Sequence, residues 1–337
     1  MAAYTTIDDP EAYFESLIWS GNSTDDRAIS GLDFAPNFVW IKCRNNAQNH
    51  NLFDTVRGAT ESLESNNTNT ENTDATSLKS FTSDGYTLGT GATVNSSSPS
   101  TKTYVGWNWK ESATAGFDIV TYTGNDTART ISHSLSAVPH FMIVRNRSEV
   151  SGDGAWQVYH GANTAAPETD NLQLAISNPT EDSAVIWNDT APTSSVFSVG
   201  SHLTVNGDGN AMLAYLWSEK QGFSKFGSYV GNGSTDGPFL WCGFRPAWFM
   251  TKRTDSSGDW RIRDIAREPH QPLDAPFYAN TAIVENDGDN DWDIVSNGLK
   301  MRGSGTGENA DGGTYIFMAF AEQPFVNSNG VPCTARP

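Results

Sequence analysis

The sequence has few cysteines, no long apolar run and no cluster of basic residues. Its three cysteines, Cys43, Cys242 and Cys333, are an odd number at wide spacing, which fits neither a disulfide framework nor a zinc knuckle. A membrane-spanning helix needs about eighteen consecutive apolar residues, and no such run is present. The N-terminal residues also lack the basic start and apolar stretch of a signal peptide. We therefore expect neither a disulfide scaffold nor insertion into a membrane.

Charged residues, and positive charge above all, are scarce. The 21 basic residues stand against 39 acidic ones, so the formal net charge is −18, and charged residues make up only 18% of the chain. A chain this acidic is repelled by a phosphate backbone, so we expect no nucleic-acid partner. Its surface polarity comes largely from Ser, Thr, Asn and Gly, which favour strands and turns. One brief helix is predicted at Asp9–Ser16, where proline occupies the first turn.

Three segments of the chain carry the same landmarks in the same order. Each opens with an aromatic residue two positions before a Gly-Asn pair; Gly124 lies 103 positions after Gly21, and Gly231 lies 107 after Gly124. Three prolines keep these spacings: Pro36, Pro139 and Pro246. Each proline precedes an apolar strand that ends on a basic residue: Lys42, Arg145 and Lys252. Each segment closes with an aromatic-rich strand that ends on a carboxylate: Tyr104–Glu111, Met212–Glu219 and Tyr315–Glu322.

These landmarks predict an all-β protein of three tandem, diverged β-sandwich repeats of roughly 105 residues, packed in pseudo-threefold fashion. The predicted organisation is an N-terminal extension over 1–13, units over 14–115, 116–221 and 222–326, and a C-terminal tail over 327–337. The apolar strands alternate poorly, so we expect many to be buried on both faces or to lie at seams between units. The polar stretch Thr60–Ser77 is predicted to be an exposed loop.

The sequence shows no recognisable catalytic motif. Its histidines do not recur at equivalent positions of the three segments and form no zinc-binding pair: His50, His133, His140, His160, His202 and His270. We predict that the chain is not an enzyme, with no catalytic residue and no cofactor. A sugar-cleaving module remains the enzymatic alternative, because the two carboxylates of a glycosidase are neighbours in space and not in sequence.

One acidic segment has the composition of a calcium loop. Its carboxylates alternate along the chain: Asp287, Asp289, Asp291 and Asp293. Oxygen-rich loops of this kind hold Ca²⁺, although the spacing differs from that of an EF-hand. A hairpin turn with solvated carboxylates explains the segment equally well, so both interpretations stay open.

Eleven tryptophans suggest aromatic contact with a ligand, because an aromatic face can stack on a sugar ring. Most of them lie in the repeated strands and are predicted to be core, whereas Trp187 and Trp292 lie in loop-like contexts and are the candidates for exposed contact. The basic strand ends are predicted to pair with the carboxylates that close the segments: Glu111, Glu219 and Glu322. The recurring Gly-Asn pairs are interpreted as turns that need the left-handed conformation.

Several stretches resemble a domain family common in tail-associated proteins of marine bacteriophages. The resemblance rests on the following segments: Phe38–Lys42, Asn49–Ala59, Ser80–Gly89, Ile186–Phe197, Gly243–Arg253 and Gly313–Phe325. It implies repeated concanavalin- or jelly-roll-like β-sandwiches and a role as a tail fibre or structural protein. It carries no catalytic or metal residue that can be transferred to this sequence.

From this resemblance we expect a virion protein of the tail fibre or a tail appendage, made in the bacterial cytoplasm and displayed on the mature particle. Its expected partners are other virion proteins and a host-surface receptor, such as a glycan. Homotrimeric assembly is favoured by analogy with fibres. The alternatives are a capsid decoration protein and a carbohydrate-binding or depolymerase module.

Overall fold

The computed structural model describes residues 4–148, 156–285 and 292–333 of the chain. The described residues are all-β: twenty-five strands, joined by turns and a few helical turns of three or four residues. The helical turns are η1 (Pro10–Ala12), η3 (Pro167–Thr169), α1 (Ala184–Trp187), α2 (Leu203–Asn206) and α3 (Thr306–Asn309). The helix predicted at Asp9–Ser16 is therefore reduced to η1, since the chain enters strand β1 at Phe14.

The first large sheet comes from the N-terminal third of the chain. Its strands are ordered β1 (Phe14–Ser20), β9 (Thr103–Trp109), β3 (Phe38–Cys43), β4 (Asn51–Asp54), β5 (Gly58–Leu63) and β6 (Asn72–Thr73). A small sheet accompanies it, ordered β2 (Arg27–Ser30), β8 (Gly85–Leu88) and β7 (Leu78–Thr82). All pairings in both sheets are antiparallel.

The second large sheet has strands in a corresponding order. They are β10 (Phe117–Thr123), β17 (Ala211–Trp217), β12 (Phe141–Asn146), β13 (Trp156–His160), β14 (Asp170–Gln173) and β15 (Glu181–Asp182). Its small companion pairs β11 (Arg129–Ser132) with β16 (Val196–Val199).

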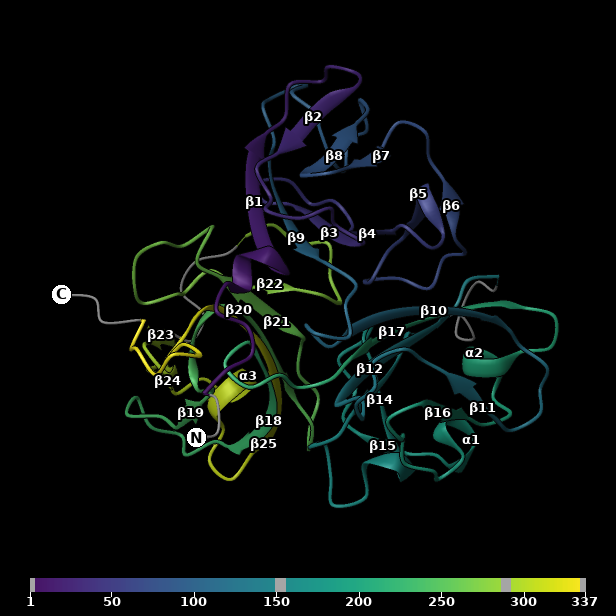
Figure 1. Ribbon diagram of the computed structural model, residues 1–337, viewed down its shortest axis with the longest axis vertical. Helices are drawn as coiled ribbons and strands as arrows, with labels where there is room; N and C mark the ends of the chain where they lie inside the picture. Colours follow the sequence, from purple (N-terminus) through teal and green to yellow (C-terminus); the bar gives the residue numbers. More distant parts are fainter. Residues whose placement is uncertain (1–3, 149–155, 286–291, 334–337) are drawn as a thin grey trace.

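The third large sheet is ordered β18 (Ser224–Val230), β25 (Thr314–Pro324), β20 (Phe244–Arg253), β21 (Arg261–Asp264) and β22 (Phe277–Tyr278). Its companion is ordered β19 (Phe239–Trp241), β24 (Gly298–Met301) and β23 (Trp292–Val295). In every large sheet the last strand of the segment therefore lies between the first and the third. Figure 1 shows the three sheets as three lobes, purple-blue, teal and green-yellow.

The three large sheets share one aromatic core. The indole of Trp109 in the first sheet lies 6.3 Å from that of Trp217 in the second and 5.7 Å from that of Trp248 in the third, centroid to centroid. The phenyl ring of Phe38 likewise lies 4.3 Å from the ring of Tyr215. One continuous hydrophobic cluster therefore draws residues from all three sheets.

The opposite face of each large sheet packs against its own small sheet. Three separate hydrophobic clusters form there, one for each lobe. Strands β3 and β12 are accordingly buried at every residue. This confirms the prediction, drawn from their poor alternation, that such strands are buried on both faces.

The recurring Gly-Asn pairs are structural, but for a different reason from the one predicted. None of the three glycines adopts the left-handed backbone conformation. The residue after each Asn adopts it instead: Ser23, Asp126 and Gly233. The glycines are required because the chain passes very close to another backbone. A Cβ on Gly124 would lie 2.0 Å from the carbonyl oxygen of Gly207. The backbone N–H of the Asn that follows each glycine donates to the side-chain oxygen of a buried asparagine. The three acceptors are Asn95, Asn206 and Asn309.

The stretch Thr60–Ser77 is not the free loop that the sequence predicted. It contains part of β5 and all of β6, and Ser65 is fully buried. The Ser65 hydroxyl donates to the carbonyl oxygen of Ala279 in the third lobe at 2.6 Å. The stretch is polar because it lies at a hydrogen-bonded seam between lobes.

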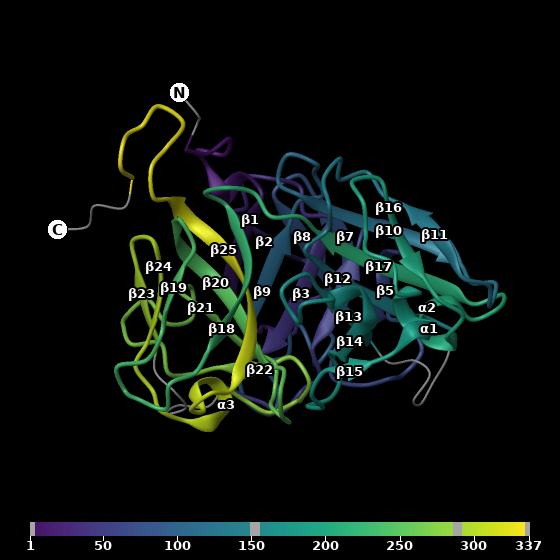
Figure 2. The ribbon, with the colours of Figure 1, turned by 90° about the horizontal axis from the view of Figure 1, so that it is seen from below.

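Both described ends of the chain lie beside the third lobe (Figure 2). The carboxylate of Asp8 accepts hydrogen bonds from the backbone and side chain of Ser328, which ties the N-terminal segment to the C-terminal one. The first and last segments therefore meet next to the third sheet.

Candidate functional site

The basic residues at the strand ends lie in the seams between lobes. Lys42, Arg145 and Lys252 are buried, and each donates to a backbone carbonyl of a neighbouring lobe. The acceptors are Ala282 in the third lobe, Asn69 in the first and Ser177 in the second, respectively. The predicted pairing with Glu111, Glu219 and Glu322 is therefore wrong. The carboxylates interact instead with Asp118, Lys225 and Arg245.

A ring N–H makes an analogous contact at each seam. The indole of Trp156 donates to the carbonyl of Glu64, and that of Trp260 donates to the carbonyl of Gln173, both at 2.9 Å. At the remaining seam Nε2 of His50 lies 3.0 Å from the carbonyl of Tyr278. Burial lowers the pKa of His50 well below its usual value. His50 is thus a neutral structural group.

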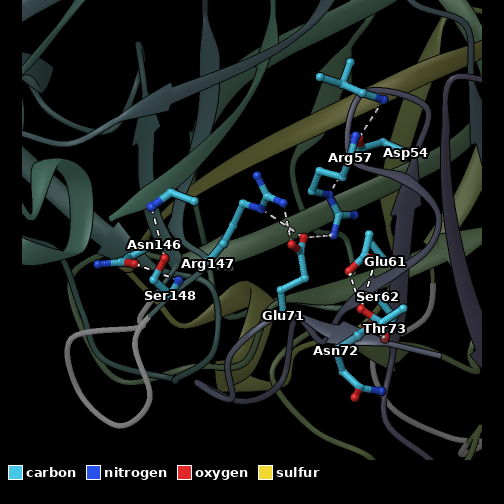
Figure 3. Close-up of polar contacts among 12 residues, drawn as sticks. Asp54, Arg57, Glu61, Ser62, Glu71, Asn72, Thr73, Asn146, Arg147 and Ser148 are labelled. Carbon is cyan, nitrogen blue, oxygen red and sulfur yellow. Dashed lines mark hydrogen bonds and ion pairs between the residues drawn. The ribbon is translucent and has the colours of Figure 1, made fainter. Parts of the chain in front are cut away.

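A buried ion network crosses the seam between the first and second lobes (Figure 3). The fully buried guanidinium of Arg57 binds Asp54 at 2.5 Å and Glu71 at 2.8 Å. Arg147, from the second lobe, points at Glu71 from the other side and pairs with it. The hydroxyl of Tyr215, also from the second lobe, donates to Asp54 at 2.7 Å.

The other two seams carry corresponding groups. Between the third and first lobes, Arg267 binds Asp264 at 2.6 Å and Glu285 at 3.0 Å, and Arg44 reaches Glu285 at 2.7 Å. Between the second and third lobes the corresponding groups are uncharged: the backbone N–H of Thr180 donates to the carbonyl oxygen of Thr254 in the third lobe at 2.9 Å, and the Thr180 hydroxyl donates to the amide oxygen of Asn163 in its own lobe at 2.8 Å. These buried polar groups therefore have partners within the protein, which accounts for them structurally.

Exposed aromatic side chains mark a different part of the molecule. Ten of the eleven tryptophans are buried, whereas Trp241 is 58% exposed. It lies on β19, an edge strand of the small sheet of the third lobe, together with Phe239, which is 47% exposed. Between them Leu240 points into the core. Because alternate residues of a strand share a face, the two aromatic rings stand on the same outer surface.

The fold itself does not need these two rings. In the first lobe the strand corresponding to β19 is β2, where Ala28 and Ser30 flank the buried Ile29. In the second lobe it is β11, where Thr130 and Ser132 flank the buried Ile131. The inward residue stays aliphatic while the outward residues change from small to aromatic. This exposed pair of aromatic side chains is therefore the candidate for a binding surface.

A groove of about 340 Å³ lies beside Trp241. Its lining includes Tyr4, Glu219, Lys225, Gly243 and Phe325. Tyr4 and Phe325 are 55% and 39% exposed, so together with Trp241 three exposed aromatic residues line the groove. We define this groove, together with Trp241 and Phe239, as the aromatic groove.

The polar part of the aromatic groove is an ion pair. The ammonium of Lys225 lies 2.8 Å from Glu219, and both side chains are about one-quarter exposed. The same ammonium lies 6.0 Å from the centre of the Trp241 ring, at the limit of a cation–π contact. A Cβ on Gly243 would come within 3.1 Å of the indole, so the glycine leaves the space that this ring occupies. The groove thus combines aromatic faces with charged hydrogen-bonding groups.

The tryptophans singled out from the sequence are not at this surface. Trp187 is 1% exposed and donates to the carbonyl of Asp170; Trp292 is fully buried and donates to the carboxylate of Glu308 at 3.1 Å. The expectation that they are exposed is wrong: Trp187, in α1, packs against Tyr159 in the core of the second lobe, and Trp292 belongs to strand β23 and faces the core of the third lobe. Trp241 was missed, although comparing Phe239 and Trp241 with the matching positions of the other segments would have revealed it.

Of the acidic segment, only Asp293 is described. Its carboxylate pairs with Arg302 at 2.6 Å. Asp287, Asp289 and Asp291 lie outside the described residues. Within the part of the chain that is described, no three His, Cys, Asp or Glu side chains form a metal-binding group.

Two carboxyl groups near the seams have pKa values raised to about 7. Burial, with added repulsion from Glu11, raises the pKa of Glu15 to about 7. Burial and a hydrogen bond with Asp118 raise the pKa of Glu111 to about 7. Both effects favour the protonated form of the Glu111 carboxyl group near neutrality. Packing between lobes accounts for both raised pKa values.

No helix among the described residues is long and apolar enough to cross a membrane. The chain matches a family model described as "Domain of unknown function (DUF7483)" over residues 9–324. This match spans nearly the whole chain, so the chain belongs to that family. No curated protein matches the sequence.

Proposed function

We propose that this member of the family is a structural protein of a bacteriophage virion, located in a tail fibre or tail appendage, and that it contacts a receptor on the host. The aromatic groove carries the proposal, because it presents rings that the fold does not need on the outside of a tightly packed framework. The resemblance of the sequence segments to tail-associated phage proteins supports the same role.

We further propose that the chain consists of three diverged β-sandwich units arranged around an approximate threefold axis. The corresponding strand orders of the three large sheets support this arrangement. So do the cyclic seam contacts, in which each lobe donates to the one before it: Lys42 to Ala282, Arg145 to Asn69, and Lys252 to Ser177. Such an interlocked framework suits a part that stays rigid while it is exposed on a particle.

The sites at which a receptor is bound are commonly carried on surface positions of a stable scaffold. Here the scaffold is the shared aromatic core, and the surface positions are the outward residues of β19, which differ from those at the corresponding strands of the other two lobes. The chain would then meet the receptor through the third lobe and hold its shape through the first two.

The test is to raise antibodies against the purified chain and to apply them, with gold labels, to particles of the phage that encodes it. Labelled tails support the proposal. Labelled heads alone would make the chain a capsid decoration protein, and unlabelled particles that also lack the chain by mass spectrometry would refute a virion role.

A second experiment tests receptor contact. Purified protein is incubated with host cells and with tail-free capsids, and co-sedimentation with each is scored. We expect binding to cells and protection from infection. Binding to capsids alone would overturn the receptor role.

A further inference from the structure

We propose that the aromatic groove is a binding site for an uncharged saccharide. This inference deepens the proposed function by naming the class of receptor, although the binding itself can be measured without the virion. Its first basis is the arrangement of the rings. Trp241 and Phe239 present two aromatic rings on one side of an edge strand, and Tyr4 and Phe325 add exposed rings at the groove. Flat, amphipathic rings supply large contact area at small entropic cost.

The second basis is the mixture of surface chemistry. A sugar ring has an apolar face of C–H groups and a rim of hydroxyls, so its site needs apolar faces beside donors and acceptors. Lys225 can donate and Glu219 can accept at the groove, and both remain partly exposed. A volume of about 340 Å³ lies at the small end of the range for small-molecule sites. A groove of this size suits one or two sugar rings better than a folded protein surface.

The third basis is charge. Lys225 is already neutralised by Glu219 at 2.8 Å, so the described residues that line the groove offer no free cation for an acidic sugar. The chain as a whole carries a formal charge of −18, which repels polyanions. The saccharide is therefore inferred to be neutral, and its binding should depend only weakly on salt.

The fourth basis is the contrast between lobes. The positions of Phe239 and Trp241 correspond to Ala28 and Ser30 in the first lobe and to Thr130 and Ser132 in the second. These replacements show which side chains the strand accepts without loss of its core. The double variant Phe239→Thr, Trp241→Ser therefore removes the rings and keeps the strand.

The experiment uses the full chain on a printed array of neutral and acidic bacterial polysaccharides, followed by calorimetric titration with the best binder. We expect the wild type to bind a neutral polysaccharide and the double variant to bind at least tenfold more weakly. The matched control is Ile18→Ser, which removes an exposed apolar side chain from β1 of the first lobe. It should bind like the wild type.

An independent readout follows from the burial of ten tryptophans. N-bromosuccinimide should oxidise one tryptophan quickly, Trp241, and the bound polysaccharide should protect it. Thermal melting of the double variant checks that it is folded. An unchanged melting temperature with lost binding supports the site.

Three binding outcomes overturn the inference. They are no binding to any neutral polysaccharide, binding that the double variant retains, and binding that is confined to acidic polysaccharides and lost in salt. A dimer in sedimentation velocity that the double variant abolishes would also overturn it, since the groove would then hold a second copy. None of these outcomes bears on whether antibodies label the virion, so failure of the site and failure of the virion proposal are distinguishable.

Discussion

Replacing Arg57 by alanine should destabilise the whole molecule. The Arg57 guanidinium is fully buried and binds Asp54, Glu71, the carbonyl of Leu52 and the hydroxyl of Tyr215. Removing it leaves the buried carboxylate of Asp54 without its counter-ion. Breaking a buried ion pair in this way costs about 3–5 kcal/mol, much of it the penalty for the uncompensated charge.

The loss is measurable as a change in melting temperature. With roughly 2 cal/mol/K of unfolding entropy per residue, the 337 residues give a total of about 0.7 kcal/mol/K. A loss of 3–5 kcal/mol then lowers the melting temperature by about 4–7 °C in calorimetry. Because the lobes share one core, we expect a single transition. A fall of less than about 1.5 °C would refute the reasoning on the ion network, since it corresponds to roughly 1 kcal/mol.

The seam between the second and third lobes supplies the matched control. Its residues at the corresponding positions are His160, Asn163, Thr180 and Thr254, where the seam between the first and second lobes has Asp54, Arg57, Glu71 and Arg147. The fourfold variant Asp54→His, Arg57→Asn, Glu71→Thr, Arg147→Thr removes all the charges together. It should be more stable than Arg57→Ala, because no buried charge is left unpaired. A fourfold variant that is less stable would show that the cost lies in packing and not in charge.

The remaining predictions concern pH, backbone approach and thiols. The pKa of Glu111 is raised from 4.5 to about 7. Between these two pH values the folded state holds a proton that the unfolded state has lost, so stability should fall as the pH rises through this range. Glu111→Gln should flatten this fall, measured as unfolding free energy in urea titrations, and an unchanged pH dependence would contradict the assignment. Gly124→Ala should cost about 1–3 kcal/mol, because its Cβ would lie 2.0 Å from the Gly207 carbonyl, whereas Gly161→Ala, whose Cβ would lie 3.6 Å from the nearest atom beyond its chain neighbours, should cost less in the same assay. A thiol reagent should label Cys333 quickly and the two buried cysteines, Cys43 and Cys242, only on unfolding, and a second fast thiol would contradict the burial of one of these two.

Much of the strand framework follows from local patterns in the sequence. The segments that carry the repeated landmarks coincide with strands β3, β12 and β20, and the closing segments coincide with β9, β17 and β25. Their continuous apolar character indicated burial on both faces, as the structure has it. These features are readable because they depend on residues that are neighbours along one strand.

The hydrogen-bond partners and the burial of the polar and aromatic side chains depend on contacts formed in the tertiary structure. The sequence suggested that Lys42 pairs with a carboxylate of its own segment, but it donates to Ala282, 240 positions away. Trp187 and Trp292 lie in segments that resemble exposed loops, yet both are buried in the hydrophobic clusters of their lobes. No local pattern encodes these contacts, because their partners come from elsewhere in the chain.

The sequence by itself determined the all-β class, the positions of many strands and their two-sided burial, because these depend on composition and on spacing along the chain. Only the tertiary structure decided that three sheets close on one aromatic core, which cations are buried at the seams, and that Trp241 stands outside. Burial is a property of what packs on a side chain from every direction, and most of those neighbours are distant in sequence.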